Sequence, residues 1–296
     1  MQQKVTFQSD GLKINGTLSI PDGAPPSAKT GGHKLPAFMV LHGFGSNSSS
    51  NNVTGPCKML NDWGYATLGF DMRGCGDSEG TRANLICLEQ VADTRSATTF
   101  LQSRPEIDGK RIGVLGSSFG AAVAVYAGGV DDRIGAIVSS GGWGNGEIKF
   151  RGQHPTPEAW AKFTKMLAEG KAHREKTGKP LMVGRYDIVP IPAALRHNLA
   201  EKSHEQFTAE TAQSMFDFRA DDVVARIAPR PLLLLHSSVD SVTPTEQSLR
   251  MFELARQPKD LHLFAETDHF MFSDSNVRVR TILKDWLDMY FPAKPK

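Results

Sequence analysis

The sequence predicts an α/β protein with a mostly parallel, twisted sheet that carries helices on both faces. Short apolar runs, which are typical of buried strands, alternate with longer segments of helical periodicity. One long segment interrupts this alternation, and a serine between glycines stands where a predicted strand gives way to a helix. These observations predict a core formed by residues 1–144 and 216–296, with an inserted cap at 145–215.

The first twenty residues predict a β-hairpin. Apolar residues such as Val5, Phe7 and Ile14 alternate loosely with polar ones, and Asp10-Gly11 lies between the two runs. An Asp-Gly pair flanked by alternating apolar residues is a strong hairpin signal.

The alternating elements follow in order along the chain. The predicted strands are 36–43, 65–71, 111–116, 133–140, 231–237 and 261–266. The predicted helices are 53–63, 85–104, 121–129 and 277–291. On the last of these helices, the residues expected to face inward are Val279, Ile282, Leu283, Trp286, Leu287 and Tyr290. Strands joined through helices run parallel, with both faces of the sheet covered.

The segment 145–215 has no further strand–helix unit of this kind. Residues 157–169 and 193–219 have helical spacing, whereas residues 180–192 contain three prolines. We expect the segment to cover the carboxyl edge of the sheet as a cap; the alternative is a pair of ordinary peripheral helices.

Charge and cysteine content limit the possible partners. The net charge of +2 gives no electrostatic basis for binding nucleic acid or a membrane surface. Cys57, Cys75 and Cys87 cannot all pair within the chain and lack metal-ligand spacing, which favours reduced thiols and a cytoplasmic location. No signal peptide and no membrane span are expected. The oligomeric state is left open, with a homodimer among the states allowed.

A candidate nucleophile lies in the segment VLGSSFGAA at residues 114–122. Gly116-Ser117-Ser118-Phe119-Gly120 matches Gly-x-Ser-x-Gly, in which the middle serine occupies a sharp, strained turn between a strand and a helix. The Ser118 hydroxyl is expected to project beyond the carboxyl ends of the strands, where ligands bind in such sheets, and Ser117 is expected to pack. A phosphate-binding loop is disfavoured, because neither G-x-G-x-x-G nor a following Gly-Lys-Ser/Thr is present.

A serine nucleophile needs a base, and the base needs an acid to orient it. Asp240 and His269 each follow a predicted strand, and the order Ser118, Asp240, His269 is the one that this architecture requires. Asp268 and Glu266 remain alternatives for the acid. Asp268 is next to His269 in the sequence, however, and the side chain of an adjacent residue seldom reaches the Nδ1 of the histidine ring well.

Two alternatives concern which histidine acts as the base. His269 as a surface histidine is the alternative to its role as the base, and His262 is a worse base because it falls inside a predicted strand.

The reaction also needs N–H donors for the developing oxyanion. The backbone N–H of Phe119 follows the nucleophile, and that of Phe44 lies in the loop after an early predicted strand. Gly43 and Gly45 would let that loop turn so that the Phe44 N–H faces the cleft. His42 precedes the nucleophile and is expected to be a structural, hydrogen-bonded histidine.

Taken together, these motifs resemble those of the α/β-hydrolase superfamily of serine hydrolases, over about residues 36–140 and 220–291. FDMRGCGDSEG (70–80) is similar to the superfamily's D-x-R-G-x-G-x-S-x-G stretch, and PRPLLLLHSSVDSVTP is similar to its acid-bearing strand and loop. TDHFMFSD (267–274) resembles the histidine loop, particularly of feruloyl or cinnamoyl esterases, which also carry a cap. Two motifs depart from those esterases. Around the nucleophile this sequence has Gly-Ser-Ser, where the esterases more often have Gly-His-Ser, and its acid loop begins with His-Ser rather than His-Gly.

Within the segment 70–80, Arg73 is expected to form a salt bridge with Asp77 or Asp71. Direct substrate binding by Arg73 is the alternative.

The resemblance implies a carboxylic ester hydrolase that acts through an acyl-enzyme on a small-molecule ester, with no metal or organic cofactor. Trp160, Phe163 and Tyr186 in the cap are candidates for a pocket that takes an aryl or hydrophobic acyl group, unless they pack the cap against the sheet. A thioesterase, an amidase or peptidase, and a carbon–carbon bond hydrolase would use the same machinery. The non-enzymatic alternative is a ligand-binding receptor on this fold.

Overall fold

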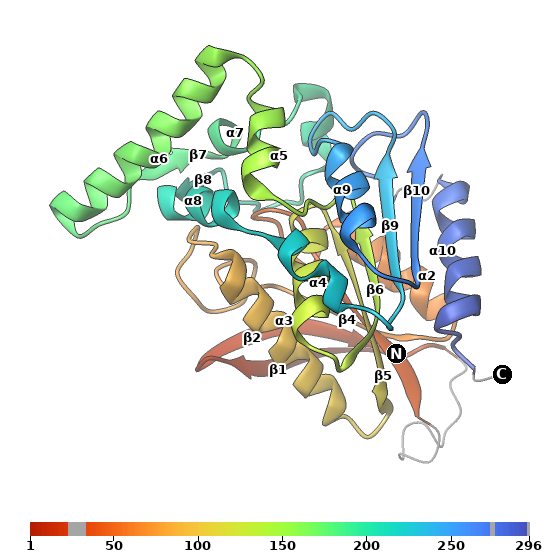
Figure 1. Cartoon of the computed structure of the whole chain (residues 1–296). Coiled ribbons are helices and arrows are strands. Elements are labelled where there is room, and N and C mark those ends of the chain that lie inside the picture. Colours follow the sequence, from red (N-terminus) through yellow and green to blue (C-terminus); the bar gives the residue numbers. More distant parts are fainter. Residues whose placement is uncertain (23–33, 273–275, 295–296) are drawn as a thin grey trace.

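The computed structural model describes residues 1–22, 34–272 and 276–294, so Ser273 and Asp274 of the predicted histidine loop lie outside the described residues. Within these ranges, one sheet contains eight strands in the order β1-β2-β4-β3-β5-β6-β9-β10 (Figure 1). The strands are β1 (Gln2–Ser9), β2 (Leu12–Ser19), β3 (Leu35–Leu41), β4 (Ala66–Phe70), β5 (Ile107–Ser117), β6 (Ile134–Ser140), β9 (Leu232–Ser237) and β10 (Lys259–Phe264).

The sheet is mostly parallel, as predicted. β1 and β2 pair antiparallel, and β2 pairs antiparallel with β4, whereas the pairs from β4 through β3, β5, β6 and β9 to β10 are parallel. The predicted hairpin is confirmed: Asp10 and Gly11 connect β1 to β2, and both have positive φ, as a tight two-residue turn requires. Every residue of β3 is buried, as expected for a central strand that is covered on both faces.

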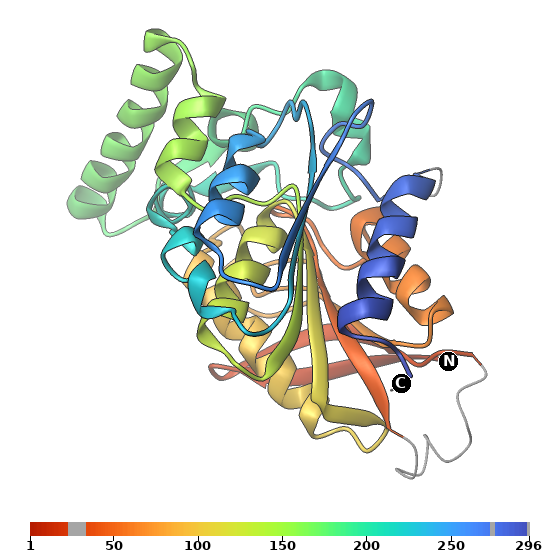
Figure 2. The ribbon, with the colours of Figure 1, turned by 45° about the vertical axis from the view of Figure 1, so that its right-hand side comes forward.

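Helices cover both faces of the sheet (Figure 2). α3 (Cys87–Gln102), α4 (Phe119–Val130) and α9 (Glu246–Leu254) pack on one face, and α2 (Asn51–Asp62) and α10 (Val277–Tyr290) pack on the other. The predicted helices are therefore confirmed, but α9 was not predicted. Two of its three buried side chains, Gln247 and Ser248, are polar, so its buried side is not the purely apolar one that sequence analysis looks for.

The inward face of α10 differs from the prediction at one position. Val279, Leu283 and Trp286 are buried, whereas Tyr290 is 37% exposed. Phe291, one residue further, turns into the core instead, where its ring packs against those of Phe38 and Tyr65.

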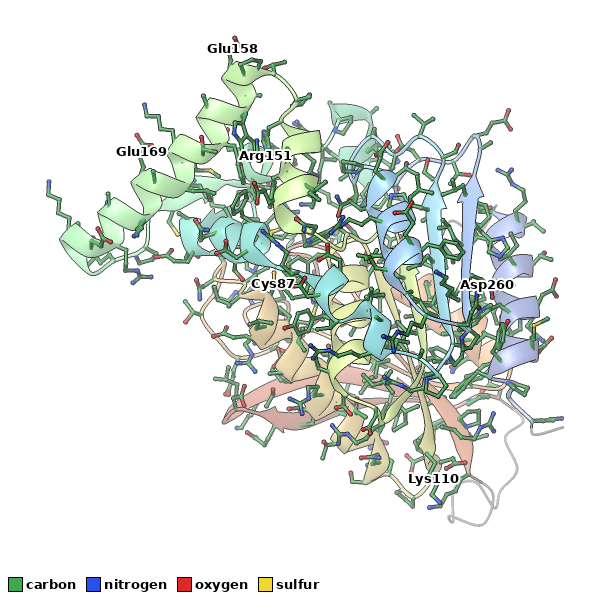
Figure 3. All side chains as sticks on the ribbon, viewed as in Figure 1. Cys87, Lys110, Arg151, Glu158, Glu169 and Asp260 are labelled. Atoms are coloured by element: carbon green, nitrogen blue, oxygen red, sulfur yellow. The ribbon has the colours of Figure 1, made fainter. Side chains whose placement is uncertain are left out.

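The segment predicted to form a cap lies at the carboxyl end of the parallel strands (Figure 1). Its elements are α5 (Gly146–Gln153), α6 (Pro157–Thr177), β7 (Met182–Gly184), α7 (Arg185–Ile188), η1 (Ala193–Asn198), β8 (Gln206–Thr208) and α8 (Ala209–Asp217). Figure 3 shows Glu158 and Glu169 on the side of α6 that points away from the body of the protein. The boundaries of a separate cap domain stay a prediction.

The helix expected over 193–219 is partly wrong. The chain forms the short 3-10 helix η1 after Pro192, and then the strand β8, which pairs antiparallel with β7. Only from residue 209 does it form the α-helix α8, because the Thr208 side chain accepts a hydrogen bond from the Thr211 N–H and so caps this helix.

The predicted partner of Arg73 is also wrong. Its guanidinium contacts Asp93, which is fully buried on α3, at 2.6 Å, and Asp10 in the hairpin turn at 2.8 Å. The Asp71 carboxylate is instead occupied by backbone N–H groups, from Ser48 at 2.6 Å and from Asp77 at 2.8 Å. Arg73 therefore ties the hairpin to α3.

The three cysteines are free, as expected for the reduced thiols predicted from the sequence. Burial raises the pKa of the Cys75 and Cys87 thiols to about 12, which keeps them unreactive. Among the helices that the structure describes, none has the length and apolar character needed to cross a membrane.

Candidate active site

Ser118 lies at the turn between the end of β5 and the first residue of α4. Its backbone has φ 55° and ψ −115°, a conformation that side-chain-bearing residues rarely adopt. The Ser118 N–H donates to the Ser140 carbonyl oxygen on β6 at 2.8 Å, and this bond helps to hold the turn. The strained strand–turn–helix geometry predicted from the sequence is therefore present.

The glycines on either side of Ser118 are required by close backbone approach. A Cβ on Gly116 would lie 2.1 Å from the Gly120 carbonyl oxygen. A Cβ on Gly120 would lie 2.5 Å from the carbonyl oxygen of His42 and 2.7 Å from that of Leu41. These neighbours are main-chain atoms in the centre of the fold, so they cannot move aside as a flexible side chain would.

We expect Gly120→Ala to lower the free energy of unfolding by about 2 kcal/mol or more, because the added methyl group overpacks the junction of β3 and α4. Gly109→Ala is the matched control, because a Cβ there would meet its nearest neighbours at 3.4 Å. Urea denaturation followed by circular dichroism measures both variants. Equal stability of the two would contradict the requirement for glycine at position 120.

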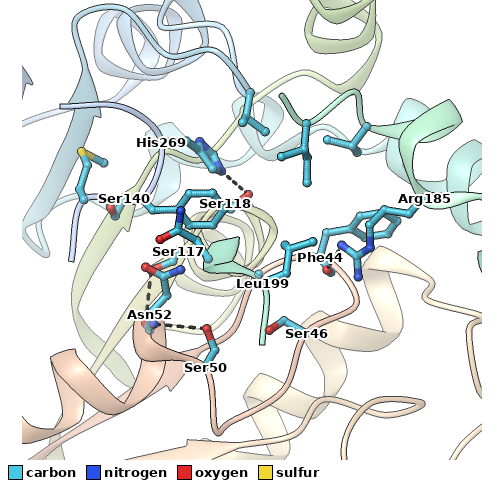
Figure 4. A pocket seen from close by; sticks show the side chains of 17 residues that line it. Phe44, Ser46, Ser50, Asn52, Ser117, Ser118, Ser140, Arg185, Leu199 and His269 are labelled. Atoms are coloured by element: carbon cyan, nitrogen blue, oxygen red, sulfur yellow. Dashed lines mark hydrogen bonds between the residues drawn. The ribbon is translucent and has the colours of Figure 1, made fainter. Parts of the chain in front are cut away.

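The three residues predicted to form a catalytic triad come together. The Ser118 Oγ lies 2.8 Å from the His269 Nε2 (Figure 4), and the His269 Nδ1 lies 2.8 Å from the Asp240 Oδ2. They follow β5, β10 and β9, which are parallel and therefore end at the same edge of the sheet. The hydroxyl can donate to Nε2 while the Nδ1–H donates to the carboxylate.

The Asp240 carboxylate is buried and fully hydrogen-bonded. Its Oδ1 accepts from the backbone N–H groups of Val242 and Thr243, at 2.8 and 2.7 Å. Burial alone would raise the pKa of Asp240, but the charge of His269 and the hydrogen bonds from His236 and His269 outweigh it and hold this pKa well below its usual range. The acid is therefore an anion at any pH at which His269 can act as a base.

The sequence did not predict that a second histidine would contact this acid. The His236 Nε2 lies 3.2 Å from the Asp240 Oδ2 and 3.0 Å from the Thr243 carbonyl oxygen. Both of these oxygens are acceptors, so Nε2 carries the hydrogen, and Nδ1 accepts from the Ser248 hydroxyl at 2.6 Å. His236 is a buried strand residue, and the sequence carries no signal for where its ring points.

The alternative residues for the acid and the base occupy other positions. The Asp268 carboxylate accepts from the N–H and the hydroxyl of Ser241, and from the backbone N–H of His269 rather than from its ring. Glu266 is exposed, and His262 lies within β10. The geometry therefore favours Asp240 and His269.

The predicted oxyanion loop, His42-Gly43-Phe44-Gly45, lies beside the nucleophile. A Cβ on Gly43 would be 3.7 Å from the Ser118 Cβ. In the part of the chain that the structure describes, the N–H groups of Phe44 and Phe119 donate to no protein acceptor, so both are free for a ligand. His42 is a structural histidine, as expected: its Nε2 accepts from the Met72 N–H at 3.1 Å.

A cavity opens beside Ser118 and His269 (Figure 4). Its apolar wall includes Val189, Ile191 and Leu199 from the segment predicted to be a cap. On another side it is lined by polar residues, among them Ser46, Ser50 and Asn52. No group of three or more His, Cys, Asp or Glu side chains within the described ranges is placed to hold a metal ion.

The three aromatic residues predicted for the substrate pocket do not line this cavity. Trp160 lies under the guanidinium of Arg151, which Figure 3 labels, at 4.3 Å from the ring centroid to Cζ. Phe163 stacks on Phe150, and Tyr186 packs under another arginine of the same segment. Trp160 and Phe163 pack the segment internally, because α6 turns its apolar side toward α5 and α8 rather than toward Ser118.

Comparison with known proteins gives the family. A protein-family model described as serine aminopeptidase, S33, matches residues 32–276. Polyketide transferase claH from Penicillium crustosum is 26% identical over 290 residues, which cover 90% of each chain.

Two solved structures share the fold. The α/β hydrolase GrgF from Penicillium sp. sh18 superposes with a TM-score of 0.79 at 21% identity, covering 98% of this chain and 99% of its own. Est1E from Butyrivibrio proteoclasticus, solved with ferulic acid bound, gives 0.69 at 17% identity, covering 97% and 98%. With a family model that spans most of its length and a sheet of this topology, the chain belongs to the serine aminopeptidase S33 family and has the α/β-hydrolase fold.

Proposed function

We propose that the protein hydrolyses carboxylic esters of small molecules through an acyl-enzyme on Ser118. The observation that carries the proposal is the continuous relay from the Ser118 Oγ through the His269 ring to the Asp240 carboxylate, with 2.8 Å at each step, at the edge of a cavity. Such a relay makes a serine hydroxyl nucleophilic at neutral pH.

The reaction proceeds in two halves. As the Ser118 Oγ attacks the ester carbonyl carbon, its proton passes to the His269 Nε2, and Asp240 stabilises the resulting imidazolium. The carbonyl oxygen becomes an oxyanion that accepts hydrogen bonds from the N–H groups of Phe44 and Phe119. His269 then protonates the leaving alcohol. A water molecule, deprotonated by the same ring, attacks the acyl-enzyme, and the acid is released as Ser118 regains its proton.

The cavity favours a hydrophobic or aryl acyl group. Val189, Ile191 and Leu199 offer an apolar wall, and transfer of apolar surface from water to such a wall favours binding. Est1E, which binds ferulic acid, has the same fold and so supports an aryl ester as one substrate.

Acyl transfer is the second candidate. The relative claH is named as a polyketide transferase, and an acyl-enzyme can be released by an alcohol or amine acceptor in place of water. A thioesterase, an amidase or a carbon–carbon bond hydrolase would differ in the leaving group. A ligand-binding receptor would have no need of the relay.

A substrate panel tests the proposal. We expect kcat/KM for p-nitrophenyl butyrate and methyl ferulate to exceed that for the matching anilides by at least about tenfold, because an alkoxide leaves more readily than an amide nitrogen. Acyl thioesters and an added acceptor alcohol complete the panel. Faster turnover of thioesters than of esters would indicate a thioesterase. Transfer of most of the acyl group to the added alcohol would indicate an acyltransferase. Absence of turnover for the whole panel would refute the proposal.

A further inference from the structure

A buried arginine connects the segment predicted to be a cap to the oxyanion loop. Arg185, the first residue of α7, is 1% exposed. Its guanidinium donates to three backbone carbonyl oxygens: Nε to His204 at 2.6 Å, Nη1 to Phe44 at 2.9 Å and Nη2 to Gly45 at 3.2 Å. Two of these three acceptors belong to the oxyanion loop.

The positive charge of Arg185 has no carboxylate partner among the described residues. Arg73 and Arg133 show the usual arrangement, because each forms a salt bridge with an aspartate. Burial lowers the pKa of Arg185 from its usual value, so the folded protein holds this charge at a cost in stability. A hydrophobic residue of similar length would fill the same space without that cost, which indicates a role other than stabilising the fold.

Arg185 is also held rigidly. Its Cζ lies 5.3 Å from the ring centroids of both Phe44 and Phe207, and these rings stack on each other at 4.1 Å. The His204 N–H donates to the Gly45 carbonyl oxygen at 2.9 Å, so a second bond ties the same loop. Figure 4 shows the Arg185 and Phe44 side chains next to each other at the cavity that contains Ser118.

We propose that Arg185 is a positioning residue for the oxyanion hole. Its planar fork fixes the carbonyl groups of Phe44 and Gly45, and so holds the backbone on the C-terminal side of the Phe44 N–H, which limits how far this N–H can turn away from the carbonyl oxygen of the substrate. Its unpaired charge also makes the potential at the cavity positive, which favours the oxyanion over the neutral ester. The inference rests on the proposed function.

Because the oxyanion exists only after attack, the loss of Arg185 should lower kcat and leave KM nearly unchanged. We expect Arg185→Met to lower kcat for p-nitrophenyl butyrate by about 10-fold to 100-fold, with KM within about threefold of the wild-type value. Arg185→Lys keeps the charge but has a single nitrogen in place of the planar fork, so it cannot reproduce all three hydrogen bonds and should recover only part of the rate.

Arg196→Met is the matched control, because Arg196 lies in the same segment and, among the residues that the structure describes, its guanidinium donates only to the Ile191 carbonyl oxygen of that segment. It should keep wild-type kcat. A phenylboronic acid, which forms a tetrahedral anion on Ser118, should bind Arg185→Met more weakly by the same factor by which kcat falls. Wild-type kcat in Arg185→Met, or a rise in KM alone, would overturn the inference.

Amide hydrogen exchange separates failure of the inference from failure of the proposed function, because it needs no substrate. Amides of residues 43–47 should exchange faster in Arg185→Met, or in Arg185→Lys if the methionine variant does not fold, and at the wild-type rate in Arg196→Met. Unchanged exchange in the Arg185 variants would refute positioning even if the enzyme hydrolyses esters. If the Arg185 variants exchange faster but the wild type hydrolyses no ester, the role of Arg185 in positioning the loop is supported and only the proposed chemistry is refuted.

Discussion

Ser118→Ala is expected to lower kcat for ester hydrolysis by about a millionfold, to the small residual rate that binding and the oxyanion donors provide. The alanine cannot form the acyl-enzyme, and the His269 ring, 2.8 Å away in the wild type, has no hydroxyl proton to accept. Initial rates with p-nitrophenyl butyrate measure the effect. Mass spectrometry after mixing with a slowly deacylating ester should detect an acyl adduct on the wild type alone.

Ser117→Ala is the matched control for this variant, since Ser117 is the adjacent serine and its hydroxyl has one long contact, 3.5 Å, to the Asn52 carbonyl oxygen. We expect it to retain wild-type kcat within about threefold, because it touches neither His269 nor the oxyanion donors. Both variants should give the circular dichroism spectrum of the wild type. Retention of activity by Ser118→Ala would remove Ser118 as the nucleophile and, with it, the proposed mechanism.

The sequence could predict the serine turn because its determinants are local. The apolar run of β5, the helix formers of α4, and the glycines at 116 and 120 lie within twenty residues of one another. The backbone contacts that exclude a Cβ at those glycines leave a direct trace in the sequence. The meeting of Ser118, Asp240 and His269 at one place was predictable because each residue follows a strand of a parallel sheet, and such strands end at one edge.

Side-chain contacts between distant segments could not be predicted. Arg73 was expected to pair with an aspartate of its own loop, yet it contacts Asp93, twenty residues away on α3. The partners of His236 and Arg185 lie on other elements and loops, so they depend on how those loops fold. The aromatic residues of α6 were assigned to the pocket because the sequence does not show which neighbouring helix their side chains face.

Asp240→Asn is expected to lower kcat by about ten-thousandfold while KM changes little. The wild-type carboxylate accepts the Nδ1–H of His269, which leaves Nε2 free to accept the Ser118 proton. An asparagine amide can donate to Nδ1 instead, which favours the tautomer with hydrogen on Nε2, and this tautomer cannot act as the base. Steady-state kinetics at pH 7.5 measures the effect.

Stability gives a second readout for the same residue. Because folding lowers the pKa of Asp240, its carboxylate stabilises the folded protein above the pKa of a free aspartate, about 3.9, and this contribution is lost as the pH falls below that value. The difference in free energy of unfolding between the wild type and Asp240→Asn should therefore stay nearly constant from pH 7 to about pH 4.5 and shrink as the pH falls further toward about 2. Urea denaturation across this range measures it.

Asp268→Asn is the matched control for the acid, because Asp268 adjoins His269 but its carboxylate accepts hydrogen bonds from Ser241 and the His269 backbone rather than from the His269 ring. We expect it to keep kcat within about tenfold of the wild type, with any loss due to a looser histidine loop. A large loss of kcat in Asp268→Asn beside near-normal turnover in Asp240→Asn would assign the acid to Asp268.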